Sequence, residues 1–288
     1  MSKMLDALVQ QLNLEPIEEN IFRGTSEHLG LRQLFGGQVL GQALSAASKT
    51  VGPKLQVHSL HGYFLRAGDA SLPVVYHVDR VRDGRSFSTR RVSAIQKGQI
   101  IFTCIASFQP FEHGLTHTTC MPDVPGPEEL LSEAQFACSL SSLPSQVREH
   151  MTADKPIEIR PVLNIDPFNP IAAEPRKYFW FRSAGTLPDD QVLHRYVLAY
   201  ASDFELLSTS LLPHAISLWQ PFMQFASLDH AIWFHDEVKV DDWLLYATDS
   251  PWANNARGYS RGHIFNRAGK LVASTAQEGL IRIRDDWR

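Results

Sequence analysis

Apolar residues follow a helical period in two long stretches of the chain. Residues 38–50 carry leucine, valine and small residues on nearly every face and hardly any charge. A helix that is apolar almost all round is a buried helix. Residues 191–204 show apolar and aromatic side chains at helical spacing behind Asp189 and Asp190, whose charge suits the start of a helix. The pattern therefore predicts one buried helix in each half of the chain. Residues 1–11 add a short amphipathic helix.

Strand patterns accompany each buried helix. In the first half the expected strands cover residues 21–28, 57–64, 74–81, 86–96 and 99–109. In the second half they cover residues 177–183, 225–234, 243–249, 256–266 and 270–283. Turn residues such as Asp83-Gly84 between consecutive strands indicate antiparallel hairpins. A buried helix with several long antiparallel strands predicts a sheet wrapped around a helix, the α+β arrangement called the hotdog.

The two halves are similar to each other in sequence. Residues 91–103 and 261–274 both read as a strand, a turn containing glycine and an apolar strand. Upstream, residues 61–66 are echoed by residues 230–235. Internal similarity of this kind indicates a duplicated unit. We expect two hotdog units whose sheets continue into each other.

The two copies differ in polarity. When they are aligned, His58 and Ala106 in the first copy correspond to Ser227 and Gln277 in the second. A polar set in one copy only predicts a single active site per chain, built mainly by the second half. The first half is expected to form a wall of its pocket.

A proline-rich stretch separates the two patterns. Ten of the 17 prolines lie from Pro110 to Pro175, where a short helix is expected around residues 128–140. Long stretches of this kind are usually functional or connect domains. The predicted organisation is an N-terminal hotdog unit over residues 1–110, a mostly irregular linker over residues 111–174, and a C-terminal hotdog unit over residues 175–288 that carries the catalytic residues.

Composition is that of an ordinary folded protein and narrows the choice of partners. Of 288 residues, 44% are hydrophobic and 20% are charged, and the formal net charge is −4. This charge argues against nucleic acid as a partner. No apolar run reaches the roughly 18 to 20 residues that cross a bilayer, so we expect no membrane insertion.

Cysteine usage and the chain ends indicate a compartment. Cys104, Cys120 and Cys138 are an odd number without a disulfide framework, which favours a cytoplasmic location. Cys104 lies in an apolar strand and is expected to fill the core. The N-terminal residues lack the features of a signal peptide, and residues 285–288 are not a peroxisomal signal.

Histidine and cysteine spacings raise the question of a metal site. His113, His117 and Cys120 have a spacing that zinc could use, but they lie in the linker without a second ligand pair. His58 and His61 lie three apart in a strand, where odd spacing places side chains on opposite faces. We therefore expect no metal and no cofactor. His58 is interpreted as a core histidine in preference to a pocket residue.

Six short motifs occur in the order and spacing of a known family. In the first half they are residues 31–39 (LRQLFGGQV), 58–66 (HSLHGYFLR) and 83–87 (DGRSF). In the second half they are residues 200–203 (YASD), 228–235 (LDHAIWFH) and 273–279 (ASTAQEG). On these motifs the chain resembles the type II acyl-CoA thioesterases (TesB-like), from about residue 14 to residue 283.

The resemblance implies a fold, an activity and a site. The fold is a double hotdog, and the activity is hydrolysis of medium- to long-chain acyl-CoA to a free fatty acid and CoA. The implied catalytic group is Asp203 on the second central helix, Ser227 before the strand over residues 228–235, and Gln277 on the last strand. Serine stands where some members have threonine, and both hydroxyls offer one donor and two acceptor lone pairs. The resemblance also implies a homo-oligomer, either a dimer or a tetramer.

Structural roles stay open for the same positions. Residues 202–205 have the form of a capping box, in which Ser202 caps a new helix and Asp203 lies in its first turn. Gln277, late on an apolar strand face, could be an edge residue facing water. Five arginines near the duplicated strands could meet CoA phosphates or lie on a solvated strand face. They are Arg85, Arg90, Arg91, Arg257 and Arg261.

The chemistry implied by the site is direct attack by water. The chain has no Gly-x-Ser-x-Gly elbow, so we expect no acyl-enzyme and a water activated by Asp203. One alternative is a hotdog enzyme that hydrates enoyl-CoA, which needs an acid/base pair, often Asp with His. Asp203, Ser227 and Gln277 have no obvious His partner in the sequence. A non-catalytic acyl-CoA binding module is the other alternative.

Overall fold

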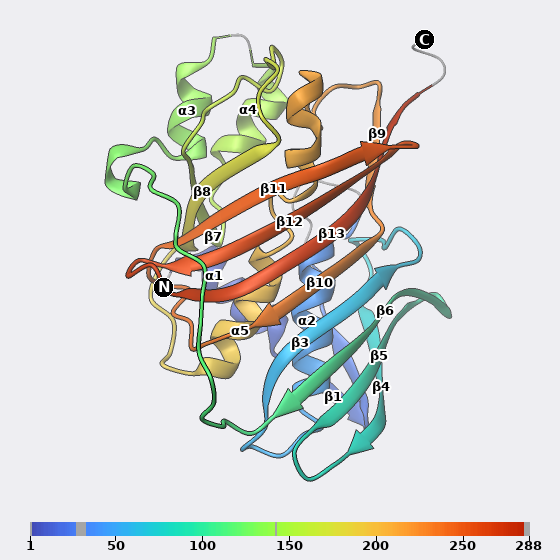
Figure 1. The fold of residues 1–288 in the computed structure, drawn as a ribbon. Coiled ribbons are helices and arrows are strands. Elements are labelled where there is room, and N and C mark those ends of the chain that lie inside the picture. The colour runs from blue at the N-terminus through green and yellow to red at the C-terminus, as the bar shows by residue number, and fades with distance from the viewer. Residues whose placement is uncertain (1, 27–32, 142, 285–288) are drawn as a thin grey trace.

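One curved sheet runs across the molecule, and the parts from the two halves of the chain each wrap around helices behind them (Figure 1). A computed structural model describes residues 2–26, 33–141 and 143–284. The end of the first expected strand (residues 27–28), the start of the first motif (residues 31–32) and the C-terminal residues 285–288 lie outside the described residues. None of the helices in the described ranges has the length and apolar character needed to span a bilayer.

The N-terminal helix α1 (Lys3–Leu12) forms as its apolar spacing predicts. Ser2 caps it, because its Oγ accepts a hydrogen bond of 3.2 Å from the N–H of Leu5. Leu5 and Leu8 are fully buried on the inner side of the helix. The helix therefore closes one end of the core that the two central helices fill.

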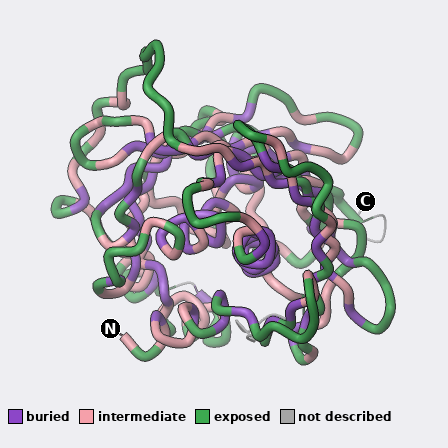
Figure 2. Tube along the Cα trace, turned by 90° about the horizontal axis from the view of Figure 1, so that it is seen from below, coloured by how far each residue is buried: buried purple, intermediate pink, exposed green. Residues whose placement is uncertain are grey.

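Two buried helices occupy the centre, as expected. Helix α2 (Gly36–Ser48) buries every residue from its second position to Ala47, and helix α5 (Gln191–Ala201) buries most of its own. Asp190 caps α5, since its carboxylate accepts a hydrogen bond of 2.9 Å from the N–H of Val192. A tube view coloured by burial shows a buried helix enclosed by curved sheet (Figure 2).

Small residues let the two helices touch through their backbones. A Cβ on Gly37 would lie 2.2 Å from the carbonyl oxygen of Tyr200, and one on Gly41 would lie 3.1 Å from that of Tyr196. Because the first glycine meets the later tyrosine, the helices run antiparallel. The N-terminus of α2 therefore lies beside the C-terminus of α5, and the C-terminus of α2 beside the N-terminus of α5.

In the described part of the chain the strands form one antiparallel sheet of thirteen strands. The first half supplies β1 (Glu15–Glu18), β2 (Ile21–Gly24), β3 (Gln56–Phe64), β4 (Val74–Asp83), β5 (Ser88–Gln96) and β6 (Gln99–Gln109). The second half supplies β7 (Ile157–Pro161), β8 (Arg176–Ser183), β9 (Met223–Ser227), β10 (Asp229–Phe234), β11 (Leu244–Asn254), β12 (Arg257–Asn266) and β13 (Leu271–Ile283). The order is β1-β2-β4-β5-β6-β3-β10-β13-β12-β11-β8-β7, and β9 pairs with β13.

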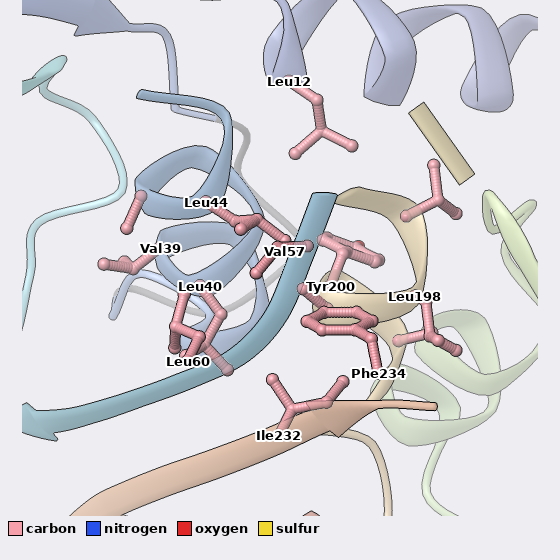
Figure 3. Close-up of a cluster of buried hydrophobic side chains, with 14 of the residues drawn as sticks. Leu12, Val39, Leu40, Leu44, Val57, Leu60, Leu198, Tyr200, Ile232 and Phe234 are labelled. Carbon is pink, nitrogen blue, oxygen red and sulfur yellow. The ribbon is translucent and has the colours of Figure 1, made fainter. Parts of the chain in front are cut away.

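The two halves join through β3 and β10, so the two sheets continue into each other as expected. Gly62 pairs with His230 and Leu60 with Ile232 across this seam. In the close-up of the core, Leu60 lies near Leu40 of α2 and Ile232 near Tyr200 of α5 (Figure 3). One apolar core therefore serves both halves of the chain.

The stretch between the halves holds more structure than the expected irregular linker. It contains a 3₁₀ turn (Pro127–Glu129) and helices α3 (Glu133–Ser139) and α4 (Ser145–Thr152), followed by β7. Strand β7 pairs with β8 and buries Ile157 and Ile159. Two isoleucines two apart are a strand signal too short to stand out among prolines. A 3₁₀ helix, η2 (Leu207–His214), then packs against β11, β12 and β13.

Candidate active site

The three residues implied by the family motifs lie at the meeting point of α2, α5 and β13. Asp203 follows α5 by two residues, so it lies just past the second central helix and not on it. Ser227 is the last residue of β9, and Gln277 lies in β13 with 1% of its surface exposed. Strands β9, β10 and β12 all flank β13. Gln277 is therefore an inward-facing residue of an internal strand, and its interpretation as a water-facing edge residue is wrong.

Ser202 does not begin a new helix. It is the C-cap residue of α5, and its Oγ donates a hydrogen bond of 2.9 Å back to the carbonyl of Ala199. The capping-box interpretation of residues 202–205 is therefore wrong, because the apolar helix upstream ends where the motif begins. Asp203 is thereby held at the end of a rigid helix.

The side chains of the three residues converge. Nε2 of Gln277 lies 2.7 Å from Oδ1 of Asp203 and 3.1 Å from Oγ of Ser227. Asp203 receives further hydrogen bonds from the Ser227 hydroxyl and from the backbone N–H of Gly37. Burial raises the pKa of Asp203 to about 6, and its hydrogen bonds from Gln277, Gly37 and Ser227 oppose that rise. A buried carboxylate with a pKa near neutrality suits general base chemistry.

The first half supplies the N-terminus of α2 to this site. A Cβ on Gly36 would lie 2.6 Å from Oδ2 of Asp203, a distance that no real Cβ contact shows. Glycine is thus needed for the carboxylate to approach the helix. The free N–H groups and dipole of a helix N-terminus favour a negative charge. The first half therefore stabilises the Asp203 carboxylate directly, which goes beyond the wall expected of it.

Sequence reasoning missed His230, which completes the polar cluster. Its Nε2 lies 2.9 Å from Oγ of Ser202, and its Nδ1 lies 3.4 Å from Nε2 of Gln277 and 3.9 Å from Oδ1 of Asp203. Because the Ser202 hydroxyl donates to Ala199, it accepts from Nε2–H of His230. Nδ1 is then an acceptor for the second hydrogen of the Gln277 amide, which it shares with the nearer Oγ of Ser227. The alternation of buried Ile232 and Phe234 in β10 is the signal that would have placed His230 inside.

His230 is neutral in this position. Burial lowers its pKa to about 3, so its approach to Asp203 is not an ion pair despite the 3.9 Å separation. The expectation that Asp203, Ser227 and Gln277 have no histidine partner is therefore wrong. The histidine nevertheless faces Ser202 and Gln277 with both ring nitrogens, so it orients the amide and has no free donor of its own.

Two buried polar atoms in the site have no partner among the described residues. They are Oε1 of Gln277 and Oγ of Ser260, which are cross-strand neighbours in β13 and β12. The amide cannot be turned over, because Oε1 would then face the Asp203 carboxylate and repel it. Gln277 therefore presents an unused acceptor next to its bond with Asp203, and a water molecule has the donors to satisfy it.

Apolar side chains enclose the polar cluster. Phe35 stacks on Phe204 with ring centroids 4.8 Å apart, and Phe64 lies within 3.0 Å of the place where a Gly36 Cβ would be. Leu207 of η2 lies over Gly279, the strand partner of Ser227. A polar centre with apolar walls suits a substrate with one reactive polar group and an apolar chain.

Comparison with known proteins identifies the family. A family model described as the acyl-CoA thioesterase N-terminal domain matches residues 26–109, and one described as acyl-CoA thioesterase matches residues 146–280. The chain is 44% identical over 284 residues to acyl-coenzyme A thioesterase 8 of Homo sapiens, covering 95% of this chain and 88% of that one. It is 41% identical over 286 residues to acyl-CoA thioesterase 2 of Haemophilus influenzae, covering 99% and 100%.

Solved structures agree with the sequence comparison. The crystal structure of an acyl-CoA thioesterase II from Mycobacterium marinum superposes with a TM-score of 0.79 at 41% identity, covering 97% of this chain and 99% of that one. The chain belongs to the type II acyl-CoA thioesterase family. It is accordingly a hydrolase of acyl-CoA thioesters. A protein with a hot dog fold from Alicyclobacillus acidocaldarius, 19% identical with a TM-score of 0.77 and covering 96% and 98% of the two chains, confirms the expected fold.

In this thioesterase the two copies align differently from the sequence-based alignment. Strand β3 has an irregularity between Val57 and Ser59, so Val57 pairs with Phe108 and Leu60 with Ala106. Ser227 pairs with Gly279 in the second copy, which makes Val57 the counterpart of Ser227. The assignment of His58 as that counterpart is wrong by one residue, because the irregularity inserts a residue that sequence spacing does not reveal.

His58 is neither a core nor a pocket residue. Its Nε2 lies 2.8 Å from Oγ of Ser107, which alternates with buried Ala106 and Phe108 and so faces outward. His61 is exposed and packs its ring edge-on against Trp233. Both histidines therefore face the outer side of the sheet. The expectation that they lie on opposite faces is wrong because of the irregularity in β3 between Val57 and Ser59.

Other sequence candidates take structural positions. Cys104 is buried, as expected of a core residue. Arg90 is buried and bonded to Asp83 and to Thr50, so it fits neither the phosphate nor the solvated-face interpretation. Three of the other arginines pair with acidic side chains: Arg91 with Asp79, Arg257 with Glu278, and Arg261 with Asp249. Within the described ranges no three His, Cys, Asp or Glu side chains are grouped to hold a metal.

Proposed function

We propose that this thioesterase hydrolyses medium- to long-chain acyl-CoA by direct attack of a water molecule activated by Asp203, with Ser227 and Gln277 completing the catalytic group and no cofactor. The observation that carries the proposal is the arrangement around one carboxylate. Gln277 donates to Asp203 while its own Oε1 is left unpartnered and buried beside that bond. A water that donates one hydrogen to Oε1 and the other to the carboxylate is held with its oxygen lone pair free.

The reaction then proceeds in two steps that balance. The water oxygen attacks the thioester carbonyl carbon, and its proton passes to Asp203. The tetrahedral intermediate collapses with cleavage of the C–S bond, and the CoA thiolate takes the proton from the Asp203 carboxyl. The products are the fatty acid and the CoA thiol, and Asp203 returns as a carboxylate. A positioned general base contributes about 10²- to 10⁴-fold in rate.

The environment favours each step. The positive end of α2 at Gly36 and Gly37 stabilises the carboxylate and the negative charge that develops nearby. The apolar side chains of Phe35, Phe64 and Phe204 exclude bulk water and suit an aliphatic acyl chain. These walls support the medium- to long-chain preference, which a panel of saturated acyl-CoA substrates measures as kcat/KM against chain length.

Further proposals concern the organisation of the protein. We infer one unit over residues 1–110 and a second over residues 175–288, joined by the segment over residues 111–174, with the catalytic groups on the second unit.

A cytoplasmic location is supported by three free cysteines, Cys104, Cys120 and Cys138. Association into a dimer or tetramer is supported by the exposed apolar residues Tyr63 and Ile105 on the outer sheet face. Light scattering after gel filtration measures the mass of the assembly.

One assay separates hydrolysis from the alternatives. Purified protein is mixed with decanoyl-CoA and a thiol reagent, and release of CoA thiol is followed with wild type, Asp203→Asn and the surface control Asp249→Asn. Loss of release in Asp203→Asn alone supports the proposal, whereas full activity of that variant would contradict it. Binding without release would indicate a binding module. Loss of the enoyl absorbance from decenoyl-CoA without thiol release would indicate a hydratase.

A further inference from the structure

A pocket lies at the opposite end of the two central helices from the catalytic group. It is bounded by the segment after α2, the first turns of α5, and the strands β3 and β6. The cavity has a volume of about 80 Å³. Helix α2 separates it from Asp203 by its whole length, roughly 20 Å at 1.5 Å per residue.

This pocket occupies the place that the internal duplication gives to a second active site. The catalytic group lies between the N-terminus of α2 and the C-terminus of α5, and the pocket lies between the N-terminus of α5 and the C-terminus of α2. Val57 and Phe108 in its wall are a strand pair that corresponds to Ser227 and Gly279. An apolar pair thus stands here where the active site has Ser227 and Gly279.

A buried arginine distinguishes the pocket from a mere gap in packing. Arg195 of α5 lines it with only 6% of its surface exposed. Its Nη2 donates a hydrogen bond of 2.9 Å to the side-chain oxygen of Gln56, and its Nε is buried without a partner among the described residues. Glu237 and Asp236 act on it through space, but no carboxylate of the described ranges forms an ion pair with it. Buried charges are normally paired, and a buried donor without an acceptor costs about 1–3 kcal/mol.

We propose that this pocket binds the carboxylate of a fatty acid, with the guanidinium of Arg195 on the carboxylate and the acyl chain along the apolar wall. One guanidinium and one amide match a single negative charge, and the nearby Glu237 and Asp236 disfavour a phosphate dianion. Val57, Phe108 and Tyr196 offer apolar surface next to that charge. The idea that the fatty acid is the enzyme's own product rests on the proposed function, whereas the binding itself does not.

The direct test is a crystal of the Asp203→Asn protein soaked with 8-bromooctanoate, whose bromine is located by anomalous diffraction. A bromine peak in the pocket, with the carboxylate on Arg195, is the expected result. A peak only beside residue 203, or no peak at saturating ligand, overturns the proposal. If the wild-type protein showed no thioesterase activity, the proposed function would be refuted. The position of the bromine would still decide whether the pocket binds a fatty acid.

Calorimetry of octanoate binding adds a quantitative test in solution. Arg195→Gln is expected to weaken binding at this site at least about tenfold, as loss of a charge-assisted hydrogen bond does. Val192 is 46% exposed at the rim, so Val192→Trp blocks the pocket without disturbing the core and keeps the test valid if Arg195→Gln does not fold. Arg91→Gln is the surface control. Unchanged affinity in both pocket variants, or equal binding of octanol, contradicts the proposal.

Discussion

Nε2 of Gln277 lies 2.7 Å from Oδ1 of Asp203, and this bond determines which atom of the amide faces the site. The nitrogen faces the carboxylate, so Oε1 is the atom left without a partner. A donor to the base and an acceptor for water are therefore combined in one side chain.

Activity is expected to fall in acid because Asp203 must be ionised to act as a base. Burial raises its pKa to about 6, so kcat/KM falls tenfold per pH unit well below pH 6 and levels off above pH 7. Asp203→Asn is expected to lose about 10²- to 10⁴-fold in kcat and to show no such titration. The pH profile of fatty acid release, measured by mass spectrometry without a thiol reagent, checks both expectations. A wild-type rate that stays flat down to pH 4 would contradict the assignment of the base.

Asp203 is also expected to reduce stability at neutral pH. Its pKa is raised above the unfolded value of 3.8, so the folded protein holds the proton more tightly. Below about pH 4 the protonated side chain is accommodated and the free energy of unfolding is highest. As the pH rises through 6, ionisation of the buried group lowers the free energy of unfolding by roughly 3 kcal/mol. Asp203→Asn should therefore be more stable than wild type at pH 8, and the difference should narrow at pH 4. Urea unfolding at the two pH values measures this. An equal or lower stability of the variant at pH 8 would show that the carboxylate is not destabilised by burial.

Gln277→Glu is expected to abolish activity although the side chain keeps its size. A second carboxylate would face Asp203 at hydrogen-bond distance, and two such groups share one proton. The apparent pKa of the site should rise and kcat should fall at least about 10²-fold at pH 7. Gln224→Glu, at an exposed position of β9, serves as the control. Retention of wild-type kcat by Gln277→Glu would mean that the amide is not needed to present the water.

His230 is predicted to be a positioning residue. Its Nδ1 accepts from the Gln277 amide and its Nε2–H binds Ser202, so His230→Leu removes one of the three acceptors around the amide nitrogen. We expect kcat to fall roughly 10- to 100-fold with little change in KM, as removal of supporting hydrogen bonds does. His230→Asn keeps an acceptor near the place of Nδ1 and should recover part of the loss. A purely structural role would lower kcat equally in both variants and track their loss of stability.

Gly36→Ala is expected to damage the site through a steric clash. The new Cβ would lie 2.6 Å from Oδ2 of Asp203, so the carboxylate must move away from the N-terminus of α2. Activity should fall at least about tenfold, since misplacement of a catalytic group by 1 Å can cost 10²-fold. Gly114→Ala, where a Cβ meets nothing within 4 Å, is the matched control and should be silent. Equal activity of the two variants would mean that the close approach is dispensable.

Sequence periodicity was sufficient for the elements that obey it without interruption. Helix α2 and the hairpins of both halves follow from apolar spacing and turn residues. The duplication indicated that the two sheets continue, and the structure shows that β3 and β10 form the seam. The convergence of Asp203 and Gln277, 74 residues apart, followed from the family motifs and not from spacing. Such long-range contacts depend on how elements pack, which local pattern does not specify.

The failures have a physical cause in each case. The irregularity between Val57 and Ser59 places His58 and His61 on the same face of the sheet, because one inserted residue changes the register without altering composition. His230 alternates with Ile232 and Phe234 on the inner face of β10, but its contacts with Ser202 and Gln277 come from distant parts of the chain, which the local pattern does not specify. Arg90 was misjudged because its partners, Thr50 among them, come from another part of the chain.

The central claim is direct attack by water without an acyl-enzyme. It is tested by a single-turnover reaction in which excess enzyme is mixed with decanoyl-CoA, quenched in acid at successive times and weighed intact by mass spectrometry. We predict that the chain keeps its unmodified mass at every time while fatty acid appears. A species heavier by one decanoyl group, forming and decaying at the rate of thiol release and absent in Asp203→Asn, would contradict the account.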